Sequence, residues 1–355
     1  MARVIPRVTL PEPGRPVCDT HAAGGALTYW SGNIRRWNSR EQLGCVAGQR
    51  CPSKGVYPVS PEISVVLKDR AFLECPRWHD DRIWVADFYR HEVVSAAVDG
   101  QDLRVEATVP QQPSGLGWLP DGRLLVVSMR DHKLLRRETS GELVVHADLA
   151  DHVDGYPNDM VVDSHGRAYV GNFGFDLMGG ADVAPSGLLR VDPDGSVTRV
   201  AEDLWFANGS VITDDGVLMV DETFGNRVSA FDIEPDGSLT NRRSWATFGE
   251  LPTAWGLNDT LASLVVAPDG CALDAEGALW IADALNGRAI RVREGGDIVQ
   301  EITVGTGVFA CGLGGADGRT LFICAAPDFD EHARAAARAG QLLSTRVEVP
   351  HAGRP

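Results

Sequence analysis

Six segments of this chain share one pattern, and this internal repeat constrains the fold more than any other feature. Each segment has a short apolar run, a turn and a second run rich in β-forming residues, which is typical of an antiparallel hairpin. The segments are LECPRWHDDRIWVAD, PSGLGWLPDGRLLVVS, PNDMVVDSHGRAYVGN, ANGSVITDDGVLMVD, PDGCALDAEGALWIAD and FACGLGGADGRTLFIC. One turn position holds Arg82 in the first segment and glycine in the other five: Gly122, Gly166, Gly216, Gly277 and Gly318.

The spacing of the repeats predicts their architecture. Equivalent positions lie 40, 44, 50, 61 and 41 residues apart, close to the roughly 40 to 50 residues of a four-stranded propeller blade. Leucine-rich and helical solenoids would need a stretch with apolar residues three and four apart in every repeat, and these segments contain none. The sequence therefore predicts an all-β fold, a six-bladed β-propeller whose blades leave only short, protected edges.

The two ends of the repeat region indicate how the ring closes. Only 45 residues follow Ala310, and among them QLLSTRVEV can form the third strand of the last blade. The segment EISVVLKD, from Glu62 to Asp69, precedes the first repeat and can supply the fourth, so we expect an N-terminal strand to close the last blade. Between these strands lies DFDEHARAAARAG, which we expect to be a solvated excursion; a helix is the alternative.

Length and composition fit one large domain with an N-terminal extension. The chain has 355 residues, 44% of them hydrophobic, and single all-β domains can exceed 200 residues. We assign residues 61–355 to the propeller. Residues 1–60 lack the repeat and carry eight Lys or Arg against three Asp or Glu. We expect them to be disordered or loosely packed coil, with a small accessory cap or an extended start site as the alternatives.

The seven cysteines form no recognisable framework. Three lie in the extension, and the repeats contain Cys75, Cys271, Cys311 and Cys324. Pairing of Cys45 with Cys51 is open, but an odd count and scattered spacing argue against a disulfide framework or a zinc module. We expect the four repeat cysteines to be buried small residues and the protein to lie in a reducing, cytoplasmic compartment.

The charge balance argues against several kinds of partner. The formal net charge is −16, from 49 acidic and 33 basic side chains, and an acidic chain without a long basic patch binds nucleic acid poorly. The chain has no run of about 18 apolar residues that would predict a transmembrane helix. No apolar core follows its basic start, as one would in a secretory signal. We expect no nucleic-acid or membrane partner, and a monomer or small homo-oligomer.

One column through the six repeats predicts a metal site: Glu74, Ser114, Asn158, Asn208, Asp269 and Ala310. The residue that opens each innermost strand of a propeller lies beside the central channel, so this column should form a ring at one end of it. Four members carry oxygen ligands, two carboxylates and two amides, which suit Ca²⁺ or Mg²⁺ better than zinc or copper. Turn chemistry explains a single Asn or Asp but not four polar residues in register. Ser114 and Ala310 should only leave room for the ion and its substrate.

The motifs around these positions resemble those of the regucalcin/gluconolactonase/luciferin-regenerating-enzyme family, also called the senescence marker protein family. They are ECPRW at Glu74, PNDMVVDSHGRAYVGN at Asn158, ANG at Asn208 and PDGCALDAEGALWIAD at Asp269, and the similarity covers roughly residues 60 to 350. The resemblance implies hydrolysis of lactones or, in distant relatives, of organophosphate esters, with one catalytic divalent ion, Ca²⁺ or Zn²⁺.

The same resemblance implies roles for the column. Glu74, Asn208 and Asp269 would be direct metal ligands. Asn158 would bind metal or substrate, directly or through water, and Asp269 would also be the general base or nucleophile. We expect one divalent ion, Ca²⁺ in the first place, with Zn²⁺, Mg²⁺ or Mn²⁺ as the alternatives.

The residues themselves support such chemistry. A metal with open positions polarises a carbonyl or phosphoryl oxygen and acidifies bound water. Water on Ca²⁺ needs a nearby carboxylate base, for which Asp269 is the candidate, and the metal would hold the tetrahedral oxyanion. No rival nucleophile is visible, because the chain has no G-x-S-x-G elbow and Ser114 has no His in its segment. H-E-x-x-H and P-loop motifs are also absent.

The second strand of each hairpin returns to the level of the column and predicts the pocket walls. The walls would include Asp87-Phe88-Tyr89, Met129-Arg130, Asn172-Phe173, Asp221-Glu222 and Asp283. The candidate substrate-binding residues are Asn158, Tyr156, Arg130, Asp176 and Phe173. Asp176 and Trp255 would form a rim or lid. A surface salt bridge is the alternative for Arg130, a solvent-facing position for His132, and blade packing for Phe88, Phe173, Phe175 and Phe224.

A metal-dependent lactonase, that is, a carboxylic ester hydrolase of the gluconolactonase type, is therefore the predicted function. Tyr156 stands where the animal sugar lactonases carry an arginine, which favours a less polar lactone or ester. Three alternatives stay open. They are a phosphotriesterase at the same metal, a non-catalytic calcium-binding scaffold and, last, a strictosidine-synthase-like carbon–nitrogen bond former, which requires a catalytic Glu.

Overall fold

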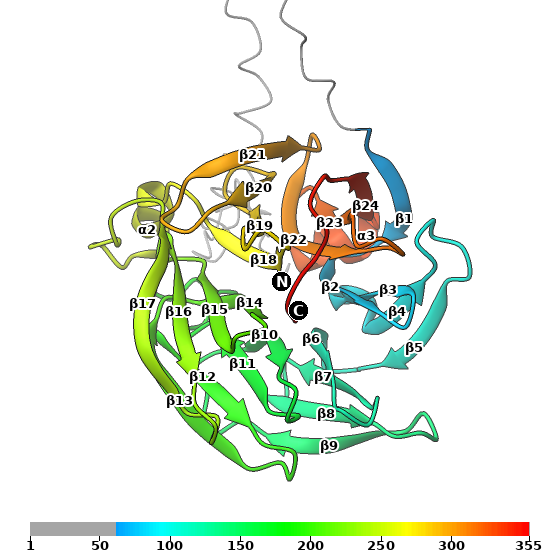
Figure 1. The fold of residues 1–355 in the computed structure, drawn as a ribbon, viewed down its shortest axis with the longest axis horizontal. Coiled ribbons are helices and arrows are strands. Elements are labelled where there is room, and N and C mark those ends of the chain that lie inside the picture. The colour runs from blue at the N-terminus through cyan, green and yellow to red at the C-terminus, as the bar shows by residue number, and fades with distance from the viewer. Residues whose placement is uncertain (1–61, 355) are drawn as a thin grey trace, which may run out of the picture.

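Six four-stranded antiparallel sheets surround a central channel (Figure 1). The structure is a computed structural model and describes residues 62–354; the expectations for residues 1–60 and their cysteines lie outside this range. Each sheet is one blade, and the strand that carries the column residue contacts the corresponding strands of the neighbouring blades around the channel. The predicted six-bladed β-propeller is confirmed.

Blades 1 to 3 use consecutive strands, numbered from the channel outward. Blade 1 comprises β2 (Leu73–His79), β3 (Arg82–Asp87), β4 (Glu92–Ala96) and β5 (Arg104–Thr108), with a 3₁₀ helix, η1 (Phe88–Arg90), after β3. Blade 2 comprises β6 (Pro113–Trp118), β7 (Leu124–Ser128), β8 (Lys133–Arg137) and β9 (Leu143–Asp148). Blade 3 comprises β10 (Pro157–Val162), β11 (Ala168–Asn172), β12 (Ser186–Val191) and β13 (Val197–Leu204).

Blades 4 to 6 complete the ring. Blade 4 comprises β14 (Ala207–Ile212), β15 (Val217–Glu222), β16 (Arg227–Ile233) and β17 (Leu239–Thr247), and α2 (Leu257–Ser263) lies in the connection to blade 5. Blade 5 comprises β18 (Pro268–Leu273), β19 (Leu279–Asp283), β20 (Arg288–Val292) and β21 (Ile298–Thr303). Blade 6 comprises β22 (Gly307–Gly314), β23 (Thr320–Ala326), β24 (Gly340–Arg346) and β1 (Ser64–Arg70). Because β1 pairs with β24, the predicted closure by an N-terminal strand is confirmed.

One expectation for blade 6 is wrong. The segment between β23 and β24 contains helix α3 (Glu331–Ala337) instead of a solvated excursion. The Asp330 carboxylate caps the helix by accepting a hydrogen bond from the Ala333 amide at 2.7 Å, and alanine and arginine are strong helix formers. Arg334 is buried and pairs with Asp328 at 2.9 Å. The cap and this ion pair anchor a helix of only two turns.

Hairpin turns place the column at the same height in every blade. The five turn glycines have φ between 69° and 84°, a left-handed conformation that glycine adopts at low cost. The first hairpin needs no glycine, because Asp80 and Asp81 take this conformation with φ of 48° and 57°, and aspartate tolerates it better than most residues. This explains why Arg82 interrupts the glycine column.

A β-bulge recurs at the column itself. The pairing of the innermost strand with the second strand is irregular at or directly beside the column residue in all six blades. A bulge inserts one extra residue into a strand and re-aims its side chain. The column side chains are thereby released from the strict alternation of the strand.

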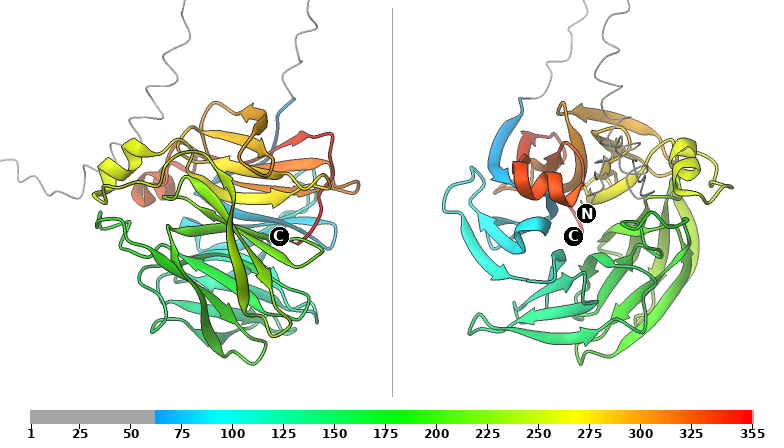
Figure 2. Two further views of the ribbon diagram at one scale, coloured as in Figure 1. Left: turned by 60° about the vertical axis from the view of Figure 1, so that its left-hand side comes forward. Right: turned by 180° about the vertical axis from the view of Figure 1, so that it is seen from behind.

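The two faces of the ring carry different segments. Helix α3 lies on one face and the C-terminal segment on the other (Figure 2). The C-terminal segment is tied to the channel rim by backbone hydrogen bonds between Ile212 and Arg354 in both directions, at 2.9 and 2.8 Å. Cys75, Cys271, Cys311 and Cys324 are buried free thiols, as expected. Within residues 62–354, no helix has the length and apolar character needed to cross a membrane.

Candidate metal centre

The structure brings the four predicted ligands together at one mouth of the channel. Glu74, Asn158, Asn208 and Asp269 are each the second residue of an innermost strand, and all four line one cavity of about 70 Å³. Their side chains are buried, with exposed fractions between 3% and 9%. The four side chains are therefore close enough to one another to form the predicted ring.

The two carboxylates of this ring are buried and form no ion pair within the described residues, and for Glu74 burial raises the pKa by more than the nearby charge of Arg77 lowers it. No ion pair among residues 62–354 includes Glu74 or Asp269. Burial, and then the charges of Asp269 and Asp159, raise the pKa of Glu74 well above its usual value. Burial and Asp159 likewise raise the pKa of Asp269, while a hydrogen bond from Asn208 acts in the opposite direction. Such a pair is costly to ionise unless a cation neutralises it.

A chain of hydrogen bonds orients the two amides. The Ser114 hydroxyl donates to Asn158 Oδ1 at 2.9 Å, and Asn158 Nδ2 donates to Asn208 Oδ1 at 2.9 Å. Asn208 Nδ2 donates to the Thr223 hydroxyl at 3.0 Å, which donates to the Pro268 carbonyl at 2.8 Å. Each amide oxygen keeps a second lone pair for a cation. Ser114 thus does more than leave room, and Thr223 was missed by the sequence reasoning.

The donor set fits a hard divalent cation. Two carboxylates balance its charge, and two amide oxygens add coordination without further charge. Within residues 62–354, no group of three or more His, Cys, Asp or Glu side chains is placed to hold a metal ion. An ion at this mouth would therefore depend on the amides of Asn158 and Asn208 as well as on the acids, which is a ligand set of Ca²⁺ rather than of structural zinc.

Three predicted wall residues are structural instead. Asp87, Glu222 and Asp283 each pair with an arginine, and each accepts a hydrogen bond from the backbone that leads into the innermost strand of its own blade. The arginine partners are, in the same order, Arg70, Arg227 and Arg288, each 2.8 Å away. The backbone amides that donate to the three carboxylates are those of Phe72, Trp205 and Ala267, at 3.2, 3.0 and 3.2 Å. These carboxylates thereby fix the backbone segments that precede Glu74, Asn208 and Asp269.

Aromatic side chains form most of the remaining wall. They are Phe72, Phe88, Tyr89, Phe173, Phe206, Phe224, Phe309 and Phe329, and we call these eight residues the aromatic wall. Phe72 contacts Phe88, Tyr89 and Phe309 with ring centroids 4.8 to 5.7 Å apart. Phe206 contacts Phe173 and Phe224 at 4.4 and 5.8 Å.

Sequence reasoning found only part of this wall. Phe88, Tyr89 and Phe173 were expected from the returning strands, and Phe224 was considered together with Phe88 and Phe173, with blade packing as the alternative. Phe72 and Phe206 stand two residues before a column residue, Glu74 and Asn208. That offset was the available signal.

Three of the five candidate substrate-binding residues do not line this cavity. Tyr156 packs against Phe173 with ring centroids 6.2 Å apart. Arg130 donates to Gln112 at 2.9 Å and to Glu331 at 2.5 Å, the salt bridge that was the alternative for it. Asp176 accepts a hydrogen bond from the Gly179 amide at 2.8 Å. Their role in binding stays a prediction, whereas Asn158 and Phe173 line the cavity.

A buried ion pair lies along the channel next to the candidate ligands. Arg77 Nη2 and Asp159 Oδ1 are 2.7 Å apart, and the two side chains are 1% and 4% exposed. Cys75 Sγ donates to the same carboxylate oxygen at 3.1 Å. The pair joins β2 of blade 1 to β10 of blade 3. Both residues stand inside the motifs ECPRW and PND, yet sequence reasoning did not single them out.

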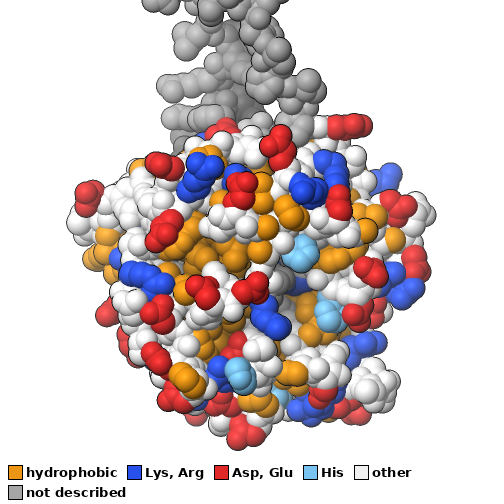
Figure 3. Space-filling view, in the orientation of Figure 1, with side chains coloured by type: hydrophobic (Ala, Val, Ile, Leu, Met, Phe, Trp, Pro, Cys, Tyr) orange, Lys and Arg blue, Asp and Glu red, His pale blue; other side chains and the backbone are white. Residues whose placement is uncertain are grey.

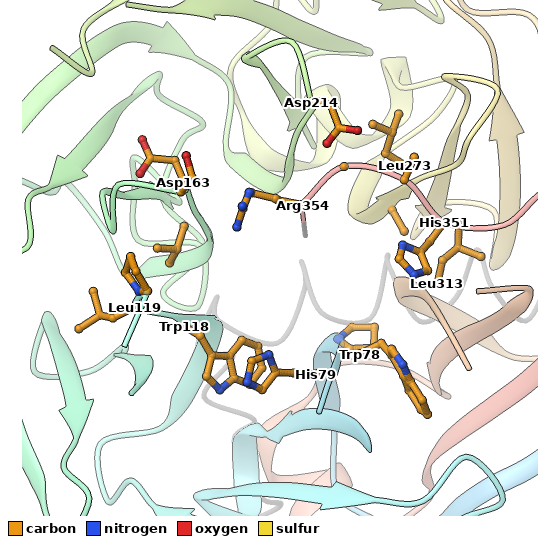
Figure 4. A pocket seen from close by; sticks show the side chains of 17 residues that line it. Trp78, His79, Trp118, Leu119, Asp163, Asp214, Leu273, Leu313, His351 and Arg354 are labelled. Atoms are coloured by element: carbon orange, nitrogen blue, oxygen red, sulfur yellow. The ribbon is translucent and has the colours of Figure 1, made fainter. Parts of the chain in front are cut away.

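A second and larger cavity opens at the other mouth. Its volume is about 600 Å³, and its lining includes Trp78, His79, Trp118, His351 and Arg354 (Figure 4). The His79 and Trp118 rings stack with centroids 4.0 Å apart. Seen from outside, this face is hollowed at its centre, with hydrophobic and charged side chains on the rim (Figure 3). None of the column residues lines this cavity.

Comparison with curated proteins gives several relatives. Regucalcin of Danio rerio is 30% identical over 173 residues, which cover 48% of this chain and 54% of regucalcin. The pentonolactonase XacC of Haloferax volcanii is 27% identical over 299 residues, or 79% of this chain and 92% of that protein. The lactonase drp35 of Staphylococcus epidermidis is 28% identical over 204 residues, or 55% and 57%. The chain thus spans little more than half the length of two of these three relatives.

Solved structures share the fold. The luciferin-regenerating enzyme has a TM-score of 0.66 at 18% identity, over 83% of this chain and 98% of its own. A calcium-binding protein, regucalcin, from Agrobacterium tumefaciens has a TM-score of 0.66 at 20% identity, over 82% and 96%. At such identities the likeness shows the fold alone. Residues 72–327 match the region described as SMP-30/gluconolactonase/LRE-like, and the chain therefore belongs to this family.

Proposed function

We propose that this protein is a metal-dependent hydrolase of lactones. The observation that carries the proposal is the pair of buried, unpaired carboxylates, Glu74 and Asp269, beside two oriented amides in an open cavity. Two relatives are named as lactonases, which supports a lactone as the substrate. We assign Glu74, Asn158, Asn208 and Asp269 as the ligands of one divalent ion, Ca²⁺ in the first place.

In the proposed hydrolysis, the bound ion and Asp269 have different roles. A bound divalent ion would supply polarisation of the lactone carbonyl and a more acidic water. Asp269 accepts a proton from the attacking water while the water oxygen bonds to the acyl carbon. The ring C–O bond then breaks, Asp269 passes the proton on to the departing oxygen, and a hydroxy acid leaves.

The hydrogen-bond chain from Ser114 to Thr223 has a positioning role. It fixes both amide oxygens before any ion or substrate arrives, so little reorganisation is needed in the transition state. The aromatic wall limits the access of bulk water to the same point.

The proposal is tested by a hydrolysis panel of sugar lactones, alkyl lactones and a phosphotriester, with chelator and with Ca²⁺, Mg²⁺, Mn²⁺ or Zn²⁺ restored. We expect chelator-sensitive lactone hydrolysis that falls by about 10²- to 10⁴-fold in Asp269→Asn, the usual contribution of a general base. Asp214→Asn, an exposed carboxylate at the other mouth, is the matched control and should be unchanged. Full activity in Asp269→Asn or in metal-free protein would refute the mechanism. Calcium binding without any hydrolysis would favour a scaffold.

A further inference from the structure

The cavity over the candidate metal centre separates polar from apolar groups. Five of its fifteen lining residues are polar, namely the four candidate ligands and Thr223, and they lie in the column or directly beside it. The other ten are aromatic or aliphatic. Among residues 62–354, no Lys, Arg or His lines this cavity. Polar recognition is therefore confined to the floor, where an ester group would react.

Apart from the four candidate ligands, the polar groups of this cavity have little hydrogen-bonding capacity left for a substrate hydroxyl. The Tyr89 hydroxyl donates to the Phe329 carbonyl at 2.6 Å. The Thr223 hydroxyl accepts from Asn208 and donates to Pro268. A hydroxyl that is buried against the aromatic wall would lose its hydrogen bonds to water without replacement, which is unfavourable.

Backbone strain indicates that the wall is built for contact with a ligand. Phe206 has a φ of 59°, which is an outlier for a bulky residue. Strain of this kind persists only where the surroundings impose it, and it is concentrated at ligand and active sites. Phe206 holds its ring against Phe173 and Phe224 two residues before Asn208.

We propose that the substrate is a small, uncharged lactone or ester that is apolar apart from its ester group, rather than a polyhydroxylated sugar lactone. This inference rests on the proposed function. The ester group lies against the column residues, and the ring carbons and a short alkyl or aryl substituent pack against the aromatic wall. An anionic substituent would meet two carboxylates and no basic side chain.

Kinetics of the full chain with Ca²⁺ test the inference directly. We expect kcat/KM to rise about fourfold per methylene from γ-butyrolactone to γ-hexanolactone, the factor that corresponds to about 0.8 kcal/mol per buried methylene. We expect γ-hexanolactone to exceed glucono-δ-lactone and xylonolactone by on the order of 100-fold or more in kcat/KM. Equal or faster turnover of the sugar lactones would overturn the inference while leaving the proposed function intact.

Binding to metal-free protein gives a readout that is independent of hydrolysis. ε-Caprolactam keeps the ring shape of an alkyl lactone, and gluconolactam carries the sugar hydroxyls. We expect the first to raise the melting temperature in a concentration-dependent manner and the second to leave it unchanged. Equal stabilisation by both lactams, or by gluconolactam alone, would overturn the inference. If no lactone were hydrolysed, the proposed function would fail and this measurement would still decide the class of ligand.

A matched pair of variants locates the effect. Phe206→Asn removes a wall ring and adds hydrogen-bonding groups, and asparagine tolerates a positive φ. We expect the preference for γ-hexanolactone over glucono-δ-lactone to fall about tenfold, within the range for loss of apolar contact in a specificity pocket. Phe248→Asn changes a partly buried phenylalanine in a different core cluster and should keep the wild-type preference. An unchanged preference in Phe206→Asn would contradict the assignment of the wall.

Discussion

The two mouths of the channel differ in which groups are left unsatisfied. The larger cavity, about 600 Å³, has charged residues that are either paired, as Asp163 is with Arg167 at 2.6 Å, or exposed, as Asp214 and Arg354 are. The smaller cavity, about 70 Å³, holds two buried carboxylates without an ion-pair partner among residues 62–354. Uncompensated buried charge, and not volume, therefore identifies the candidate reactive mouth.

Strand β2, seven residues long, runs from one mouth of the channel to the other and contains both compensated and uncompensated polar groups. It begins near Glu74 at the candidate metal centre and ends at His79 in the larger cavity. Arg77 lies between them in the buried ion pair with Asp159. The polar groups in the middle of the channel are thus compensated by one another, whereas those at the metal mouth are not.

Removing this ion pair gives the largest expected loss of stability. Arg77→Met leaves Asp159 buried and unpaired, and we expect the free energy of unfolding to fall by about 3–5 kcal/mol, measured by urea denaturation. The double variant Arg77→Met/Asp159→Leu should recover most of this loss, because both charges are then gone. A double variant as unstable as Arg77→Met would show that packing, and not charge, is the important contribution.

Metal should stabilise the protein more at alkaline than at acid pH. The raised pKa values of Glu74 and Asp269 mean that the folded protein binds more protons than the unfolded chain above the ordinary carboxyl range. The contribution of these two carboxyls to the stability of the metal-free protein is therefore fully present at low pH and is lost as pH rises toward their folded pKa values. A fixed Ca²⁺ concentration that is about 100 times the Kd at pH 6.5 should add about 2.7 kcal/mol at that pH. The same concentration should add more at pH 8 than at pH 5, because the cation displaces protons and its Kd falls as pH rises.

Thermal melts at about pH 5, 6.5 and 8, with and without Ca²⁺, measure this linkage. The double variant Glu74→Gln/Asp269→Asn is the control, since it removes both titrating ligands. It should lose the response to Ca²⁺ and the part of the pH dependence that these two carboxyls contribute, while the part that comes from Asp221 remains. A response to Ca²⁺ that is equal at all pH values would contradict the assignment of these carboxylates as ligands.

The sequence could predict those parts of the site that depend on residues close together in the chain, and not those that depend on contacts between blades. The register of Glu74, Asn158, Asn208 and Asp269 was predictable, because each residue stands eight positions before a hairpin turn and the turn is a local feature. The aromatic wall gathers from several blades, so its convergence depends on ring closure. Helix α3 was only the alternative to a solvated excursion, because a cap at Asp330 and burial of Arg334, not a long amphipathic pattern, stabilise it.

Two acidic residues at equivalent strand ends show most clearly what the sequence alone does not predict. Asp87 and Asp221 both close the second strand of their blades in the sequence pattern. Asp87 pairs with Arg70, whereas both carboxyl oxygens of Asp221 are buried without a well-formed hydrogen bond. Nothing in the local sequence distinguishes a paired from an unpaired carboxylate, because the partner comes from another strand.

Asp221→Asn should stabilise the protein at high pH. Burial raises the pKa of Asp221, and the neighbouring Cys271 thiol offsets only part of this effect. The stability of the wild type therefore falls as pH rises above the ordinary carboxyl range, and an amide of the same shape removes that loss. We expect little change in the free energy of unfolding at pH 5 and a gain at pH 8, measured by urea denaturation at both pH values. Asp87→Asn is the contrast and should destabilise the protein at both pH values, because it leaves Arg70 without its buried partner.

The smallest effect is expected at the larger mouth. Trp118 stacks on His79 at 4.0 Å and meets Trp84 edge-on at 5.4 Å, so Trp118→Leu should lower the free energy of unfolding by about 1 kcal/mol without changing lactone hydrolysis. Burial lowers the pKa of His79, and removal of the covering indole should move that pKa back up toward its ordinary value, as followed by NMR titration of the ring protons. A loss of hydrolysis in this variant would show that the two mouths are coupled through β2, and the distinction drawn between them would fail.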